Sequence, residues 1–216
     1  MHKLLYSDLE NYILSKIHNK TEDWMENLKK IAIQQRIPIM DDASIHFVRQ
    51  LIRIVKPKKI LEIGTGIGYS ALMMHDAYPY SEILTIEKDS QRYEDAMRHI
   101  QAHQKENDIH VINGDALDVL NQLPKGDPFD LVLIDASKGQ YQRFFEHIEP
   151  YLSDTGIVIS DNVFLLRYVI KKQTYPTRYR NIVNSIQAYN DWLAQHSNFD
   201  TSFLPIGDGL AVSVKH

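Results

Sequence analysis

The chain has 216 residues, no cysteine and a formal net charge of −4, and 44% of its residues are hydrophobic. We expect one domain over residues 1–216 with a full core, and the missing cysteines exclude disulfides, thiolate metal sites and a cysteine nucleophile. The negative net charge provides no global basic field for nucleic acid, so any such contact must be local. No stretch approaches the roughly 20 apolar residues of a membrane span, and no apolar signal core is present, so we expect a cytoplasmic protein without membrane contact.

Helical periodicity precedes the first strand, and strands alternate with helices after it. Residues 1–56 form the expected N-terminal helices: Pro38 interrupts them, and Asp41 and Asp42 begin a helix that ends at Lys56-Pro57. Residues 57–216 form the expected sheet core. The expected strands are 60–63, 82–87, 109–113, 129–135, 156–161 and a hairpin of 199–204 with 209–214. The expected helices are 70–74, 89–103, 116–123, 141–152 and 181–194.

This alternation predicts an α/β fold with a mostly parallel sheet and helices on both of its faces. Such sheets bind ligands outside the carboxyl ends of their strands. Residues directly after each expected strand are therefore candidates for a common site.

The strand at 60–63 runs into three alternating glycines. Residues 62–68 read E-I-G-T-G-I-G, which differs from the G-x-G-x-x-G spacing of dinucleotide sites. Glycines let the backbone approach a ligand closely, and the helix that begins near Ser70 points its N-terminus at that ligand. The carboxylate of Glu62 disfavours a pyrophosphate and suits a ligand with a cationic amino-acid end. Taken alone, however, the turn is also compatible with a packing role.

Acidic and small residues follow the next two strands. Glu87 ends the second strand, about 20 residues after the turn, where a carboxylate can accept both ribose hydroxyls of a nucleoside; the simpler alternative is a solvated carboxylate. Gly114, Asp115 and Ala116 follow the third strand. Asp115 either caps the next helix or faces an adenine amino group, and the two roles are compatible.

Oxygen ligands follow the fourth and fifth strands. Asp135 ends one, and Asp161 and Asn162 end the other, so neighbouring strand ends would bring them together. Two carboxylates and an amide oxygen suit Mg²⁺. Lys138 lies on the loop after Asp135, and a divalent cation would disfavour its charged form, which makes it a candidate base. Each of these residues singly is more typical of a turn or surface role, whereas the combined pattern is much more specific.

The E-I-G-T-G-I-G-Y-S run at 62–70, Glu87, the D-A-S-K run at 135–138 and the D-N-V run at 161–163 together resemble the metal-dependent O-methyltransferases of the catechol and caffeoyl-CoA type. The resemblance covers nearly the whole chain. It implies a Rossmann-like fold with a seven-stranded sheet, an antiparallel C-terminal hairpin strand and extra N-terminal helices. It also implies S-adenosylmethionine (SAM) as the methyl donor and a homodimer, which the apolar N-terminal helices and the C-terminal hairpin support.

The resemblance further assigns roles to individual residues. It implies that Lys138 is the base and that Asp135, Asp161 and Asn162 hold Mg²⁺ or Mn²⁺, which the oxygen ligands suit equally. The residues implied in SAM binding are Met40, Glu62, Gly64, Gly66, Ser70, Glu87, Gly114, Asp115, Ala116 and Asp135. Gly66 is a departure, because some members carry an aromatic residue there.

The metal site predicts an acceptor with two neighbouring oxygens, because a bound cation can chelate both. A catechol and a 5-hydroxyuridine each provide such a pair. The segment 167–180 reads R-Y-V-I-K-K-Q-T-Y-P-T-R-Y-R, and cations interleaved with tyrosines suit a phosphate backbone with unstacked bases. An acyl-CoA phosphate would also be attracted, and a solvated lid is an equally good explanation of the segment. The predicted substrate-binding cations are Arg167, Lys171, Lys172, Arg178 and Arg180.

The chain also resembles the bacterial tRNA 5-hydroxyuridine methyltransferases of this family. We therefore rank methylation of the wobble uridine in the tRNA anticodon region first and a small catechol or caffeoyl-CoA acceptor second. A nucleotide-binding module without catalysis is weakened by the presence of Lys138, Asp161 and Asn162. A nicotinamide dehydrogenase would leave the metal set unexplained, and its glycine spacing is missing.

Overall fold

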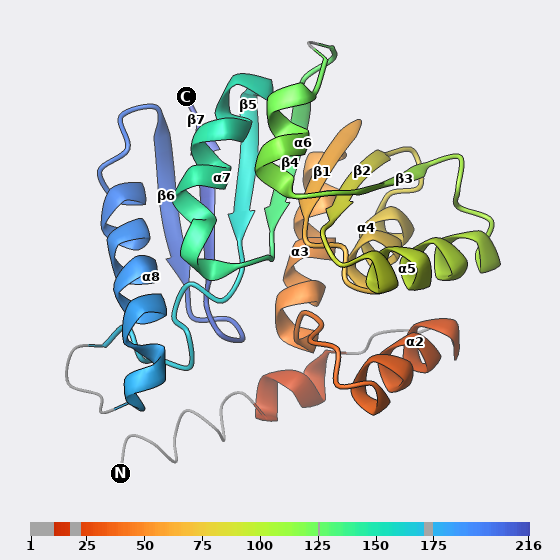
Figure 1. Ribbon diagram of the computed structural model, residues 1–216, viewed down its shortest axis with the longest axis horizontal. Coiled ribbons are helices and arrows are strands. Elements are labelled where there is room, and N and C mark those ends of the chain that lie inside the picture. The colour runs from red at the N-terminus through yellow and green to blue at the C-terminus, as the bar shows by residue number, and fades with distance from the viewer. Residues whose placement is uncertain (1–10, 18–22, 125, 171–174) are drawn as a thin grey trace.

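Seven strands form one sheet in the computed structural model, which describes residues 11–17, 23–124, 126–170 and 175–216. The strand order is β3-β2-β1-β4-β5-β7-β6 (Figure 1). Strands β1 to β5 are parallel, and β7 runs antiparallel to both β5 and β6. The mostly parallel sheet with a C-terminal hairpin is thus confirmed. The strands are β1 (Lys59–Ile63), β2 (Glu82–Glu87), β3 (Ile109–Asn113), β4 (Phe129–Ile134), β5 (Leu152–Ser160), β6 (Phe199–Leu204) and β7 (Leu210–Lys215).

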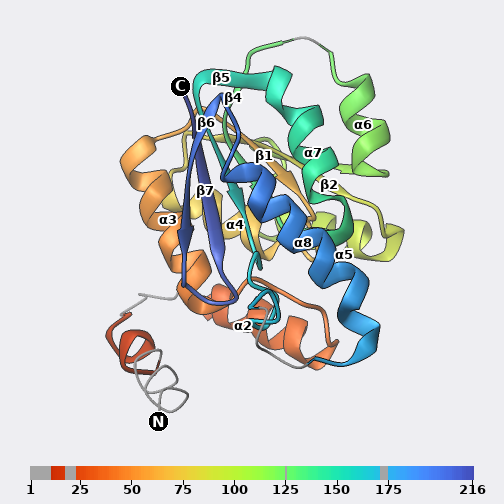
Figure 2. The same cartoon turned by 90° about the vertical axis from the view of Figure 1, so that its left-hand side faces the viewer.

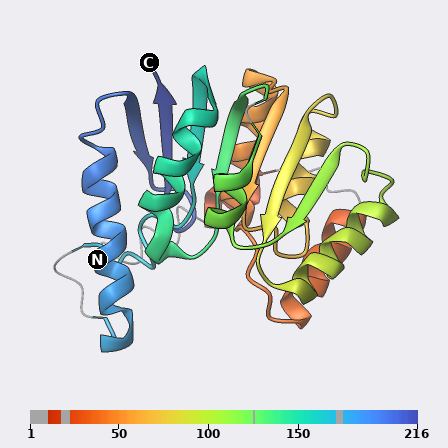
Figure 3. The same ribbon diagram turned by 45° about the horizontal axis from the view of Figure 1, so that its top comes forward.

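Helices cover both faces of this sheet (Figures 2 and 3). The helices are α2 (Asp23–Gln34), α3 (Asp42–Val55), α4 (Tyr69–Ala77), α5 (Ser90–Ala102), α6 (Ala116–Gln122), α7 (Tyr141–Ile148) and α8 (Arg180–Leu193). One core cluster packs α2 to α5 against the sheet, and a second packs α6 to α8 against the opposite face. Short 3-10 turns are η1 (Lys138–Gln140), η2 (Glu149–Tyr151) and η3 (Thr177–Tyr179). Within the described ranges, no helix has the length and apolarity needed to cross a bilayer.

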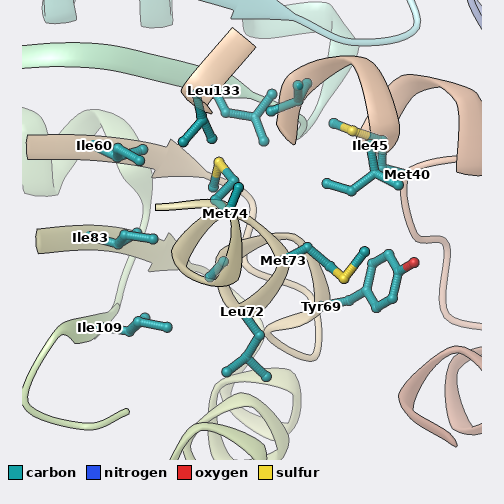
Figure 4. Close-up of a cluster of buried hydrophobic side chains, with 14 of the residues drawn as sticks. Met40, Ile45, Ile60, Tyr69, Leu72, Met73, Met74, Ile83, Ile109 and Leu133 are labelled. Atoms are coloured by element: carbon teal, nitrogen blue, oxygen red, sulfur yellow. The ribbon is translucent and has the colours of Figure 1, made fainter. Parts of the chain in front are cut away.

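The central strand β1 contributes to both cores through the alternation of its side chains. Ile60 lies in the cluster with α4, where Figure 4 shows it beside Ile83 and Met74. Leu61 and Ile63 lie in the other cluster. Since strand side chains alternate between faces, Glu62 shares the face of Ile60 and lies beneath α4. This position decides what its carboxylate contacts.

Local capping explains the predicted start of α3. The Asp41 Oδ1 atom accepts hydrogen bonds from the backbone N–H groups of Ala43 and Ser44, each at 3.0 Å. The Asp41 Oδ2 atom accepts one from the Ser44 hydroxyl at 2.6 Å. These contacts satisfy amides that an uncapped helix would leave without partners. The cap also fixes the chain beside Met40.

Two neighbouring predicted boundaries are wrong. The helix expected over 141–152 ends as α7 at Ile148, and the strand expected from Gly156 begins at Leu152. Pro150 has no N–H to continue the helix, and it lies in η2 instead. Leu152 already pairs with Phe129 of β4, and the register then shifts before Ile157 pairs with Leu131. The residues between Leu152 and Ile157 are not hydrophobic, so the hydrophobic pattern did not predict a strand there.

Candidate active site

A cavity of about 540 Å³ lies at the carboxyl ends of the parallel strands. Its lining includes residues that follow β1, β2, β3, β4 and β5, as the strand-end rule predicts. The lining contains these predicted site residues: Met40, Gly64, Gly66, Ser70, Glu87, Gly114, Asp115, Ala116, Asp135, Lys138, Asp161 and Asn162. Apart from Glu62, the topology therefore brings the predicted cofactor, metal and base residues to a single cavity.

The glycine turn serves both packing and the cavity, at different positions. A Cβ atom at Gly64, whose φ is +104°, would lie 2.0 Å from the carbonyl oxygen of Asp135. A Cβ at Gly66, whose φ is +56°, would meet no atom within 4 Å, and this residue lines the cavity. Gly64 thus permits close packing of β1 against the end of β4, whereas Gly66 leaves backbone exposed to a ligand.

Glu62 lies behind the turn and is fully buried. The hydroxyl of Ser70 donates to its Oε1 atom, and the hydroxyl of Thr85 donates to its Oε2 atom at 2.6 Å. Burial raises the pKa of Glu62 to about 7, although the Ser70 and Thr85 hydrogen bonds oppose this rise. Glu62 is absent from the cavity lining, whereas Ser70 is part of it. Any influence of Glu62 on a ligand would therefore run through Ser70.

Glu87 faces the cavity from the end of β2 and braces the glycine turn. Its Oε2 atom accepts the backbone N–H of Gly66 at 2.8 Å, and its Oε1 atom accepts that of Asp89 at 2.9 Å. A carboxylate has about four acceptor sites, so both oxygens keep capacity for ligand hydroxyls. The predicted ribose contact is compatible with this geometry.

Asp115 is the N-cap of α6 and also lines the cavity. Its Oδ1 atom accepts the backbone N–H of Leu117 at 3.0 Å, and the Lys88 ammonium donates to its Oδ2 atom at 2.8 Å. The hydrogen bond from Lys88 is the main reason that the pKa of Asp115 is lowered. Asp115 therefore caps the helix and lines the cavity, and its contact with an adenine stays a prediction.

A half-buried carboxylate, Asp135, and a buried one, Asp161, meet where β4 and β5 end. Ile134 pairs with Ser160, so Asp135 and Asp161 follow on adjacent strands, and the backbone N–H of Asp161 donates to the carbonyl of Ile134 at 3.0 Å. Burial, followed by the negative charge of Asp135, raises the pKa of Asp161 well above its ordinary value. Burial also raises the pKa of Asp135, while the charge of Lys138 opposes that rise. The charges of Asp135, Asp161 and Lys138 therefore influence one another in the cavity lining.

This acidic pair fits a divalent cation. Asp161 is 1% exposed, and its Oδ2 atom is buried without a hydrogen-bond partner. A buried carboxylate oxygen without a donor, beside a second carboxylate, is costly unless a cation compensates it. The described part of the chain contains no group of three or more His, Cys, Asp or Glu side chains suited to a metal. The predicted site therefore depends on Asn162 for its third protein ligand.

Comparison with known proteins shows the family. The model of the O-methyltransferase family matches residues 15–216. This chain belongs to the O-methyltransferase family. A Staphylococcus aureus protein provisionally described as a caffeoyl-CoA O-methyltransferase is 32% identical, with a TM-score of 0.89 over 96% of this chain and 99% of that one. This likeness confirms the Rossmann-like methyltransferase fold.

Two further relatives cover nearly all of the chain. The caffeoyl-CoA O-methyltransferase of Eucalyptus gunnii is 28% identical, over 97% of this chain and 88% of the relative. An O-methyltransferase of Bacillus cereus, solved in complex with SAH, is 23% identical, with a TM-score of 0.84 and 97% of each chain covered. The predicted family is thus confirmed, while the predicted metal and tRNA specificity stay predictions.

Several cavity residues of this O-methyltransferase were not predicted. Tyr69, Arg92 and Phe144 line the cavity from the first turns of α4, α5 and α7. Figure 4 shows Tyr69 beside Met73. A usable signal exists, because the first turn of each helix that follows a parallel strand faces the same sheet edge as the strand end. The residue types by themselves give no signal that these residues line the cavity.

The three predicted substrate-binding cations within the described residues lie outside the first cavity. Arg167 lines a second cavity, which also includes Asn162. Arg178 and Arg180 are exposed, and the Arg178 guanidinium lies 5.0 Å from the ring centroid of Tyr179. Lys171 and Lys172 lie outside the described residues.

Proposed function

We propose that this O-methyltransferase moves the methyl group of SAM to a hydroxyl of a small phenolic acceptor that carries a second, neighbouring oxygen. The observation that carries the proposal is the pair of Asp135 and Asp161 in the lining of the first cavity, where the buried Oδ2 atom of Asp161 has no hydrogen-bond partner. The names of the relatives support it, because those of Eucalyptus gunnii and Staphylococcus aureus are described as acting on caffeoyl-CoA.

The first cavity is the proposed SAM site. The exposed backbone at Gly66, the acceptor capacity of Glu87 and the helix cap at Asp115 suit the amino-acid, ribose and adenine parts of this cofactor. SAM supplies the methyl group. The Bacillus cereus relative, which was solved with SAH, supports the assignment.

Asp135, Asp161 and Asn162 would hold the cation, and Mg²⁺ or Mn²⁺ suits their oxygens. A bound cation would stabilise the anionic form of the acceptor oxygen. Lys138 lines the same cavity, and we assign to its Nζ atom the acceptance of the acceptor proton. The walls around these groups would orient the acceptor oxygen, and orientation supplies much of the rate in such transfers.

The relatives reverse the order in which the sequence pattern ranked the acceptors. The curated relative and the more similar solved structure reported above are described as caffeoyl-CoA enzymes, which favours a small phenol or its thioester over tRNA. We therefore place the small-molecule acceptor first.

A tRNA wobble 5-hydroxyuridine is the second candidate acceptor. The supporting observation is a tyrosine cluster in which the ring of Tyr168 lies 5.4 Å from those of Tyr175 and Tyr179, with Arg178 over Tyr179. Aromatic rings with an adjacent guanidinium suit unstacked bases and phosphates.

One set of assays separates the candidates. We would incubate the protein with SAM and Mg²⁺ and either 3,4-dihydroxybenzoate, caffeoyl-CoA or tRNA that lacks 5-methoxyuridine, and detect the methylated products by mass spectrometry. We expect a methyl ether of a diphenol, lost with EDTA and restored by Mg²⁺. Product from tRNA alone would replace the first candidate with the second.

A charge-reversed variant, Arg178→Glu with Arg180→Glu, is the matched test of the acceptor class. Methylation of the dihydroxybenzoate should change less than about twofold, because both residues lie outside the cavities. Loss of activity on every acceptor would contradict the small-molecule proposal.

A further inference from the structure

A second cavity, of about 510 Å³, adjoins the first. The two share Ile39 and Asn162. The second cavity is lined by Ile39, Asp41, Asn162, Leu166, Arg167, Gly207 and Asp208. Because Asn162 belongs to the proposed cation site, this hollow is the space that an acceptor would occupy beside it.

The wall formed by Leu166 and Arg167 has an unusual backbone. The φ angles are +44° at Leu165, +53° at Leu166 and +64° at Arg167. The left-handed region is unfavourable for residues with a Cβ, and a run of such residues persists only where the surroundings enforce it. The other described non-glycine residues with positive φ, apart from Asn162, follow α2, α3 and α5, where a left-handed residue commonly ends a helix. The turn at 165–167 has no such helical explanation.

Asp208, at the tip of the β6–β7 hairpin, holds this turn from two sides. Its Oδ1 atom accepts the backbone N–H of Leu166, in the middle of the left-handed run. Its backbone carbonyl accepts the N–H of Phe164 at 2.9 Å. The neighbouring Gly209 carbonyl accepts the N–H of Val163 at 3.0 Å. A single residue that lies far away in the sequence therefore fixes the amide at the centre of the strained turn.

The glycines on each side of Asp208 allow this close approach. A Cβ at Gly209 would lie 2.5 Å from the Phe164 ring, and a Cβ at Gly207 would lie 1.9 Å from the Oδ2 atom of Asp41. Both glycines have positive φ, at +93° and +55°. The hairpin tip is thus wedged between the start of α3 and the segment after Asn162.

We propose that Asp208 is a positioning residue for the methyl acceptor, which holds the turn at 165–167 so that Leu166 and Arg167 wall the acceptor site. The inference rests on the proposed function for the identity of the ligand. Leu166 is 57% exposed, although the strained backbone holds it at the cavity edge. Its side chain and that of Ile39 offer apolar surface to the flat ring of a diphenol, and the cation site lies alongside.

Asp208→Ala and Asp208→Asn separate this role from general stability. The asparagine keeps an oxygen that can accept the Leu166 N–H, and the alanine does not. In Asp208→Ala we expect amide hydrogen exchange in a peptide covering 163–169 to become at least about tenfold faster, as loss of a hydrogen bond to a charged group predicts. We expect the KM for 3,4-dihydroxybenzoate to rise about tenfold, while the Kd for SAH changes less than about twofold. Asp208→Asn should restore most of both properties.

Asp200→Ala, at an exposed aspartate of the same hairpin, is the matched control and should match the wild type in exchange, KM and SAH binding. Unchanged exchange over 163–169 in Asp208→Ala would overturn the proposal, as would an Asp208→Asn variant that resembles the alanine. A parallel loss of SAH affinity would also overturn it. If the wild type binds SAH but methylates no diphenol, the proposed function fails, and the exchange pattern still decides whether Asp208 holds the turn.

Discussion

Gly64 and Gly66 lie two residues apart in one turn, but their surroundings predict that alanine at each position lowers the unfolding free energy by a different amount. Gly64→Ala would force a Cβ against the Asp135 carbonyl, so we expect a loss of about 3 kcal/mol or more in unfolding free energy. Gly66→Ala meets no atom, so its cost should be about 1–2 kcal/mol from backbone strain. Because the added carbon meets open space, we expect the Kd for SAH to change less than about threefold. Urea unfolding measures the free-energy losses, and calorimetric titration measures the affinity for SAH. A Gly66→Ala variant that loses as much unfolding free energy as Gly64→Ala would contradict the different surroundings assigned to the two glycines.

The buried Glu62 carboxyl should make stability depend on pH. Its pKa is about 7 in the folded chain and near 4.5 in the unfolded one, so the folded state binds more protons between these values. The contribution of Glu62 is therefore fully present below about pH 4.5 and is lost as pH rises through about 7, by on the order of 2–3 kcal/mol. Glu62→Gln, whose amide can still bond Ser70 and Thr85, should flatten this part of the curve. Urea unfolding between pH 4.5 and 7.5 tests it, and equal slopes in the two proteins would refute the assignment.

At the scale of elements, the cap of α3 ties helix stability to the edge of the site. Asp41→Ala removes the acceptor of the Ala43 and Ser44 amides, so we expect a loss of about 1 kcal/mol in unfolding free energy. Asp41→Ser, with a capping hydroxyl, should recover most of that loss. Chemical denaturation of the three proteins compares them, and an alanine variant as stable as the wild type would show that the cap contributes nothing.

The alternation of strands and helices predicted most of the fold. It also predicted that the strand-end residues share one site, because the carboxyl ends of parallel strands meet at one edge of the sheet for any loop conformation. The alternation of β1 also contained the information that Glu62 shares the face of Ile60, beneath α4. The left-handed turn at 165–167 was not predictable, since nothing in its own residues favours positive φ. It depends on Asp208, and no local pattern connects a loop to a hairpin tip that follows a further helix.

At the scale of the whole molecule, the acidic pair should make stability depend on divalent cations. Without a cation, Asp135 and Asp161 repel each other in a buried site, so Asp161→Asn should unfold at a higher temperature than the wild type at pH 8. With Mg²⁺ at 100 times its Kd, the wild type should gain about 2.7 kcal/mol, because the cation binds only the folded chain. The variant should gain little, since it lacks one of the two charges. Thermal unfolding with EDTA and with a Mg²⁺ series measures both effects, and an equal Mg²⁺ response in the two proteins would place any bound cation elsewhere.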